Sequence, residues 1–160
     1  MLPLPLPDPQ ATARLADALA SQLVAGDVLC LDGPLGAGKT TLVRALVAAL
    51  GGDPAQVASP TFTLMHIYQA RLRVVHVDAY RLSSAAGLGA LGFDEAADGA
   101  VAVVEWAERV ADAFAGDRCW RVRIDHDGAG GRIADVIPPA GKRLQLPVIE
   151  RMLPPEAPAG

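Results

Sequence analysis

What this sequence lacks excludes several classes of protein. No apolar stretch reaches the roughly 18 uninterrupted residues that a membrane-spanning helix needs, and the proline-punctuated start carries no basic segment of the signal-peptide kind. We therefore expect a cytoplasmic protein that does not contact a membrane. Fourteen Lys and Arg against eighteen Asp and Glu give a net charge of −4, which is not the basic charge of a nucleic-acid-binding domain. Any contact with RNA is expected to come through a partner.

Cysteine is also scarce. The two cysteines, Cys30 and Cys119, lie in apolar, strand-like runs, which favours two buried small side chains over a disulfide or a reactive pair. The sequence has no Cys-x-x-Cys, and His66, His76 and His126 are scattered without ligand spacing. A zinc site is therefore not expected.

The 160 residues, of which 51% are hydrophobic, predict one folded domain. A proline-rich lead over 1–9 and a tail over 154–160 are expected to be flexible. Apolar residues at helical spacing predict helices, and short apolar or alternating runs predict strands. The expected helices cover 12–24, 41–50 and a short 83–91, and the expected strands cover 27–32, 61–68, 71–77, 101–104, 121–126 and 132–137. Hairpins are expected to join 61–68 to 71–77 and 121–126 to 132–137.

The segment from Gly33 to Thr40 fits the pattern G-x-x-x-x-G-K-[ST] and lies between an expected strand and an expected helix. In such a loop successive backbone N–H groups wrap the phosphates of a nucleotide, and Gly36 and Gly38 permit the backbone to approach them. Lys39 can place its charge on the terminal phosphates, Thr40 can offer its hydroxyl to Mg²⁺, and the helix N-terminus attracts the anion. The pattern predicts a single α/β domain of the P-loop NTPase type, with a mixed central sheet that contains β-hairpins and is flanked by helices. A chance glycine turn is the alternative.

A P-loop needs an acidic partner, because Mg²⁺ prefers oxygen ligands and usually takes one or two carboxylates besides phosphate and water. Asp78 and Glu105 each follow an apolar strand-like run, at the strand end where α/β sheets place their ligands. Either residue could instead be a solvated acid at the end of a strand. The residues alone do not divide the roles between them.

The absence of asparagine bears on which nucleotide the loop binds. Guanine-specific P-loop proteins usually carry an Asn-Lys-x-Asp element, and this chain contains no asparagine, which favours ATP over GTP. The segment 59–63, Ser-Pro-Thr-Phe-Thr, either forms a loop that senses the terminal phosphate through Thr61 or simply leads into a strand.

Four motifs follow one another along the chain: Leu-Gly-Ala-Gly-Lys-Thr-Thr at 35–41, Ser-Pro-Thr-Phe-Thr-Leu at 59–64, His-Val-Asp-Ala-Tyr-Arg-Leu at 76–82 and Val-Glu-Trp at 104–106. Together they resemble the TsaE (YjeE) family, small bacterial ATPases needed to make threonylcarbamoyladenosine in tRNA. The resemblance runs from about residue 6 to residue 132. It implies a Mg²⁺-dependent ATPase, weak alone and activated by TsaD-like and TsaB-like partners, that drives turnover of their transferase complex and touches tRNA indirectly.

The resemblance also implies roles for single residues. Lys39, Asp78 and Glu105 are the expected catalytic residues. Thr40 and Glu105 are expected to bind Mg²⁺, while Asp78 either completes the metal shell through water or orients the attacking water. The expected nucleotide-binding residues are Gly33, Gly36, Ala37, Gly38, Lys39, Thr40 and Thr41 in the loop, with Ala11 and Thr12 near the N-terminus and Arg132 late in the chain.

Two positions depart from the family pattern. Pro34 replaces a commonly acidic residue, and Ala79 replaces the usual Leu before Tyr80. Pro34 is expected to stiffen the loop entrance and to remove one N–H, which could lower nucleotide affinity modestly.

Trp106 either packs on nucleotide or partner or belongs to the core. No arginine finger is identifiable, since Arg81 is a candidate only by its nearness to Asp78, and we therefore expect the partner to complete the site.

Two other functions share the same loop. A small-molecule kinase usually carries an Arg-rich lid, but 83–99 contains no Arg or Lys. A non-catalytic module that binds ATP as a structural ligand would not need the two acids.

Four arginines alternate along their expected strands. They form either a basic face or an ordinary solvated one. They are Arg71, Arg73, Arg121 and Arg123.

Overall fold

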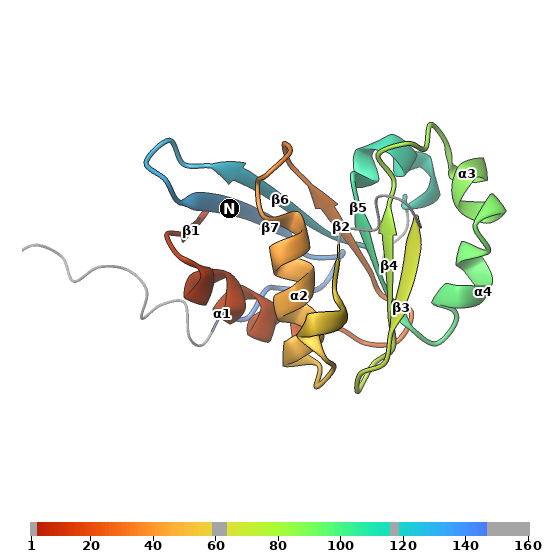
Figure 1. The fold of residues 1–160 in the computed structure, drawn as a ribbon, viewed down its shortest axis with the longest axis horizontal. Helices are drawn as coiled ribbons and strands as arrows, with labels where there is room; N and C mark the ends of the chain where they lie inside the picture. The colour runs from red at the N-terminus through yellow and green to blue at the C-terminus, as the bar shows by residue number, and fades with distance from the viewer. Residues whose placement is uncertain (1–2, 59–63, 116–118, 147–160) are drawn as a thin grey trace, which may run out of the picture.

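A seven-stranded mixed sheet forms the centre of the computed structural model, which describes residues 3–58, 64–115 and 119–146 (Figure 1). The strands are β1 Leu4–Leu6, β2 Val28–Asp32, β3 Met65–Tyr68, β4 Val74–Asp78, β5 Val101–Glu105, β6 Cys119–His126 and β7 Arg132–Ile137. The helices are α1 Pro9–Ala20, α2 Lys39–Ala49, α3 Ala85–Ala90 and α4 Phe93–Ala97, with 3-10 turns η1 Pro54–Gln56 and η2 Ala107–Ala113. Within these residues, no helix has the length and apolar character needed to span a membrane.

The order of the strands places the candidate site. The sheet runs β1-β7-β6-β2-β5-β4-β3. β6, β2, β5 and β4 run parallel to one another, whereas β3 pairs antiparallel with β4, β7 with β6, and β1 with β7. The expected mixed sheet with two hairpins is confirmed. Because β2, β4 and β5 point the same way, their carboxyl ends meet at one edge.

Helices cover both faces of the sheet, and alternate residues along each strand pack against them (Figure 1). α1 and α2 pack on one face, where Trp120 of β6 is fully buried. α3, α4 and η2 pack on the other face, over Val75, Val77 and Val104. Two buried faces explain why the central strands read as continuous apolar runs.

Helix boundaries differ from the expected ones for local reasons. α1 begins at Pro9 rather than at residue 12, because the Asp8 carboxylate caps the helix by accepting the N–H of Ala11, and proline suits the first helical position. α2 begins at Lys39, directly after Gly38 in the left-handed conformation. The expected helix over 83–91 is shorter, Ala85–Ala90, and a second short helix follows it after Gly92, which also has positive φ.

The proline-rich lead contains a strand that the sequence pattern did not predict. Leu4–Leu6 pairs with β7, and Leu6 is buried in the core, so the expectation of a flexible lead is corrected for these three residues. Proline fits there because an edge strand leaves part of its backbone unpaired. β3 begins at Met65. The expected strand start at 61–63, the proposed phosphate-sensing segment 59–63 and the tail 154–160 lie outside the described residues.

The two cysteines lie within the protein as free thiols, and the four strand arginines make local contacts. Cys30 is buried and Cys119 half-buried, and burial raises the pKa of Cys30 to about 12. Three of the arginines donate to backbone carbonyls, and the fourth forms an exposed ion pair with Asp125. The arginine contacts are Arg71 to Ala20, Arg73 to Ala96 and Asp98, Arg121 to Phe114, and Arg123 to Asp125. These local contacts favour the interpretation of an ordinary solvated surface.

Candidate active site

The loop between β2 and α2 is built on glycines with positive φ. Gly36 and Gly38 have φ of +76° and +104°, and a Cβ added at either would meet no atom within 4 Å. The loop therefore borders open space where it turns into α2. Since the first N–H groups of a helix have no partner inside the helix, this space faces a preformed set of donors for an anion.

Gly33→Ala is expected to destabilise the protein and abolish nucleotide binding. Gly33 has φ of +142°, and a Cβ there would collide with the carbonyl oxygen of Ile124 on β6. The free energy of unfolding should fall by more than the roughly 1–3 kcal/mol of a strained backbone alone. Gly51→Ala is the matched control, because Gly51 also has positive φ but faces open space. Urea denaturation measures both variants, and equal losses would contradict the collision.

Lys39 is the first residue of α2, and its side chain folds back onto the loop that precedes the helix. Its ammonium donates to the carbonyl oxygens of Gly33 at 2.6 Å and Pro34 at 3.0 Å, and it sits 4.1 Å from the centre of the Trp106 ring. Burial lowers the pKa of Lys39, while the carboxylates of Glu105 and Asp78 act in the opposite direction. The same Pro34 carbonyl accepts the N–H of Ala37, so Pro34 shapes the loop through its oxygen although it lacks an N–H.

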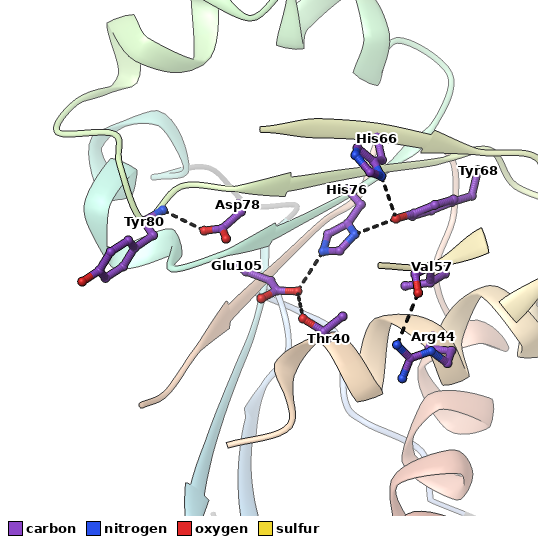
Figure 2. A network of polar contacts seen from close by, with 9 residues as sticks. All are labelled: Thr40, Arg44, Val57, His66, Tyr68, His76, Asp78, Tyr80 and Glu105. Atoms are coloured by element: carbon purple, nitrogen blue, oxygen red, sulfur yellow. Dashed lines mark hydrogen bonds and ion pairs between the residues drawn. The ribbon is translucent and has the colours of Figure 1, made fainter. Parts of the chain in front are cut away.

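The two expected acids lie side by side at the carboxyl edge of the sheet. Asp78 and Glu105 are register partners on β4 and β5, and both are largely buried. The Thr40 hydroxyl donates to Glu105 Oε1 at 2.8 Å, which joins the start of α2 to the end of β5 (Figure 2). Asp78 Oδ1 accepts the N–H of Tyr80 at 2.9 Å. The structure thus brings the loop and both acids together.

A cavity of about 490 Å³ lies over these groups. Arg81 lines it from an exposed position. A second cavity, of about 240 Å³, adjoins the same loop, and Ala37, Gly38 and Thr41 line both. The first cavity is lined by Leu35, Gly36, Ala37, Gly38, Lys39, Thr40, Thr41, Leu64, Asp78, Tyr80, Arg81, Glu105 and Trp106.

The second cavity receives two of the four expected nucleotide residues that do not line the first, while Gly33, whose carbonyl accepts from Lys39, lines neither cavity. Thr12 and Arg132 line it, but Ala11 does not: its side chain is fully buried in the core and its N–H is held by Asp8. The side chain of Arg132 binds the loop itself as well as lining the cavity. Its guanidinium donates to the carbonyls of Gly36 and Ala37 in the loop, each at 3.1 Å, and to Gly131 at 3.0 Å in its own turn.

Arg132→Lys is expected to weaken ATP binding by about tenfold or more, since each hydrogen bond from a charged donor is worth roughly 1.5–3 kcal/mol and 1.4 kcal/mol is a factor of ten. A lysine keeps the charge but cannot hold two loop carbonyls in a fork. Arg123→Lys, which alters only an exposed pair with Asp125, is the control. Equilibrium binding of a fluorescent ATP analogue provides the measurement, and an unchanged affinity for Arg132→Lys would show that the loop does not depend on this contact.

Trp106 is half-buried and packs against the core beneath α3, α4 and η2, as one of its two expected placements required, and it also lines the first cavity. Its ring contacts both Lys39 and the exposed Tyr80, whose ring centre is 5.0 Å away. Among the described non-glycine residues it alone has positive φ, 57°, and its N–H is fixed by the Leu31 carbonyl. Such backbone strain is typical of functional sites.

Sequence reasoning missed a polar chain behind Glu105. His76 Nε2 lies 2.8 Å from Glu105 Oε1, and His76 Nδ1 lies 3.1 Å from the Tyr68 hydroxyl (Figure 2). In the sequence, His76 opens the motif at 76–82 and lacks the spacing of a zinc ligand, and neither observation gives it a role. The signal that could have found it is a titratable side chain in the middle of an apolar strand, because such a group needs buried hydrogen-bond partners.

The oxygen groups around the first cavity fit Mg²⁺. A hydroxyl and a carboxylate, from Thr40 and Glu105, lie within hydrogen-bond distance of each other, and Asp78 is their neighbour. Mg²⁺ is commonly held by one or two carboxylates together with phosphate oxygens and water. Thr40 can donate its hydrogen to Glu105 and still offer a lone pair to a metal. Over the described part of the chain, no three His, Cys, Asp or Glu side chains form a cluster that could hold a metal.

Comparisons with known proteins agree on one family. The model of the family described as "Threonylcarbamoyl adenosine biosynthesis protein TsaE" matches residues 6–134. The tRNA threonylcarbamoyladenosine biosynthesis protein TsaE of Treponema pallidum is 43% identical over 103 residues, which are 64% of this chain and 76% of that protein. The protein of the same name from Rickettsia conorii is 39% identical over 100 residues, 62% of this chain and 57% of that protein. The crystal structure of Bacillus subtilis YdiB superposes with a TM-score of 0.68 at 28% identity, covering 89% of this chain and 88% of that one.

Proposed function

Because the chain belongs to the TsaE family of threonylcarbamoyl adenosine biosynthesis proteins, we propose that it hydrolyses ATP in support of the enzymes that form threonylcarbamoyladenosine in tRNA. The observation that carries this proposal is the meeting of the loop's Lys39 and Thr40 with two strand-end carboxylates around one cavity. That arrangement supplies hydrogen-bond donors to the phosphates, oxygen ligands for a metal and a carboxylate that can orient the attacking water, all within a single site.

The phosphates of ATP would lie against the loop and the start of α2. Free N–H groups at the helix start and the positive φ of Gly36 and Gly38 favour a close anion. On nucleotide binding, Lys39 would exchange the carbonyls of Gly33 and Pro34 for phosphate oxygens. The exchange stays within one cavity, because Lys39 already lines it.

Thr40 and Glu105 would hold Mg²⁺, which when bound supplies positive charge that neutralises the phosphates as the terminal bond breaks. Asp78 lies beside Glu105 and uses Oδ1 to hold the backbone of Tyr80. We assign Asp78 the role of orienting the attacking water. The water oxygen bonds to the terminal phosphorus and the bond from that phosphorus to the bridging oxygen breaks, which releases ADP. One hydrogen of the water stays on the phosphate formed, and the other passes to a phosphate oxygen or to solvent.

The nucleoside part of ATP would occupy the second cavity. Thr41 lines both cavities, so a ligand that follows the start of α2 can reach from one to the other. Thr12 of α1 and the glycine-rich turn before Arg132 form the walls of this cavity. Arg132 would then act on the nucleotide chiefly by holding the loop.

Hydrolysis is expected to be slow for the isolated protein and to rise many-fold with the partners. Arg81 lines the first cavity from an exposed position, and a docked partner could order it or add a cation of its own. The test is phosphate release from ATP by this protein alone, with TsaD-like and TsaB-like proteins, and with those proteins plus tRNA. Full-rate hydrolysis by the isolated protein would contradict activation by partners.

Two outcomes would replace the proposal with another function. ATP consumption that transfers phosphate to a small acceptor instead of water would identify a kinase. Tight ATP binding without hydrolysis under any of these conditions would identify a non-catalytic nucleotide-binding module. Radiolabelled terminal phosphate separates the cases, because free phosphate, a phosphorylated acceptor and intact ATP are resolved by chromatography.

A further inference from the structure

His76 is a fully buried titratable residue that the reaction above does not use. It lies in the middle of β4, with 0% of its surface exposed, between the apolar Val75 and Val77. Its Nε2 is 2.8 Å from Glu105 Oε1, and its Nδ1 is 3.1 Å from the Tyr68 hydroxyl (Figure 2). A buried imidazole is costly unless both nitrogens have partners, and here both do.

The chemistry of the two partners fixes the direction of these hydrogen bonds. An ionised carboxylate only accepts, so Nε2 of His76 carries a hydrogen and donates it to Glu105. In the neutral ring Nδ1 then accepts from the hydroxyl of Tyr68. Burial raises the pKa of that phenol, which keeps its proton on the oxygen for donation. Tyr68 therefore holds the tautomer and the orientation of the ring.

The result is an asymmetric carboxylate. Oε1 of Glu105 receives two donors, the Thr40 hydroxyl and His76 Nε2, both at 2.8 Å. Each carboxylate oxygen has about two lone-pair sites, so these donors occupy Oε1 and leave Oε2 for other ligands. Side chains that orient metal ligands in this way are as important to affinity as many ligands themselves.

We infer that His76 is a positioning residue for the metal site: held by Tyr68, it clamps Oε1 of Glu105 so that Oε2 is presented to Mg²⁺ or to a water on it. The inference rests on the proposed function, because it assumes a Mg²⁺–ATP complex in the first cavity. It concerns the Mg²⁺-dependent part of nucleotide binding and leaves the contacts between the loop and the phosphates unchanged.

The test compares two polar replacements that differ in which ring nitrogen they mimic. The amide nitrogen of His76→Gln reaches the place of Nε2 and can still donate to Glu105. That of His76→Asn reaches only the place of Nδ1 and leaves Glu105 unclamped. Binding of a non-hydrolysable ATP analogue is measured by calorimetry with EDTA and along a Mg²⁺ titration, with thermal unfolding to verify folding. His126→Gln, at an exposed histidine on β6, is the control.

His76→Asn is expected to require about 10- to 100-fold more Mg²⁺ for half of its metal-dependent gain in affinity, the usual cost of losing such a contact. His76→Gln should stay within about threefold of the original protein, and Tyr68→Phe should lie between them. Equal Mg²⁺ requirements for Asn and Gln, or losses that appear equally in EDTA, would overturn the positioning role and leave the proposed function standing. No Mg²⁺-dependent binding by the unaltered protein would overturn both.

Discussion

Lys39→Ala is expected to reduce ATP hydrolysis by about 10²- to 10³-fold, the usual cost of removing one donor aimed at the charge that develops in a transition state. Lys39 lines the first cavity with 5% of its surface exposed, and its ammonium contacts the loop carbonyls and the Trp106 ring. A charge sheltered from water acts more strongly on phosphate than an exposed one. ATP binding should weaken as well, because in the proposed site the same ammonium would contact the phosphates before the reaction.

The chain offers a matched control, since Lys142 is its only other lysine. Lys142 is partly exposed and contacts Asp27 and the Trp120 ring, away from both cavities. Lys142→Ala removes the same charge and should leave hydrolysis unchanged. Single-turnover phosphate release in the presence of the partners measures both variants. Equal losses would mean that net charge rather than position matters, and would remove Lys39 from the mechanism.

The loop and its two acids were predictable because their signals are local. Eight consecutive residues from Gly33 to Thr40 fix the turn and the helix start, and a polar residue that ends an apolar run marks Asp78 and Glu105. Their meeting at one edge followed from a parallel sheet without any knowledge of side-chain contacts. The same reasoning identified α2 within two residues at its start, where Gly38 in the left-handed conformation decides the boundary.

What remained unpredicted depends on contacts between distant segments. Leu4–Leu6 becomes a strand only because β7 offers it an edge, and proline composition alone favoured a flexible lead. Arg132 has no sequence signal that separates a nucleotide contact from a hold on the loop 95 residues away. His76 needed the register of β4 and β5 before its neighbour Glu105 could be recognised. Ala11, a position transferred from a family pattern, lies in the core and lines neither cavity, so its contact with nucleotide stays a prediction.

The second large effect separates the two acids. Asp78→Asn is expected to slow hydrolysis by about 10²- to 10⁴-fold, the range for a group that assists proton transfer or orients water, while Mg²⁺-dependent ATP binding stays near its original value. Asparagine keeps an oxygen that can accept the N–H of Tyr80, so the turn at the end of β4 should persist. Glu105→Gln should instead raise the Mg²⁺ requirement, because an amide is a weaker metal ligand and disturbs the contacts with Thr40 and His76.

The two variants are informative only as a pair. Each is nearly isosteric, each removes one negative charge, and the residues are register partners on adjacent strands, so a general change in the field of the cavity would affect both alike. We measure ATP-analogue affinity along a Mg²⁺ titration and phosphate release at saturating Mg²⁺. A Mg²⁺ requirement raised equally in both would make Asp78 a second metal residue. Unchanged hydrolysis in Asp78→Asn would remove it from the reaction and leave the orientation of water to a partner.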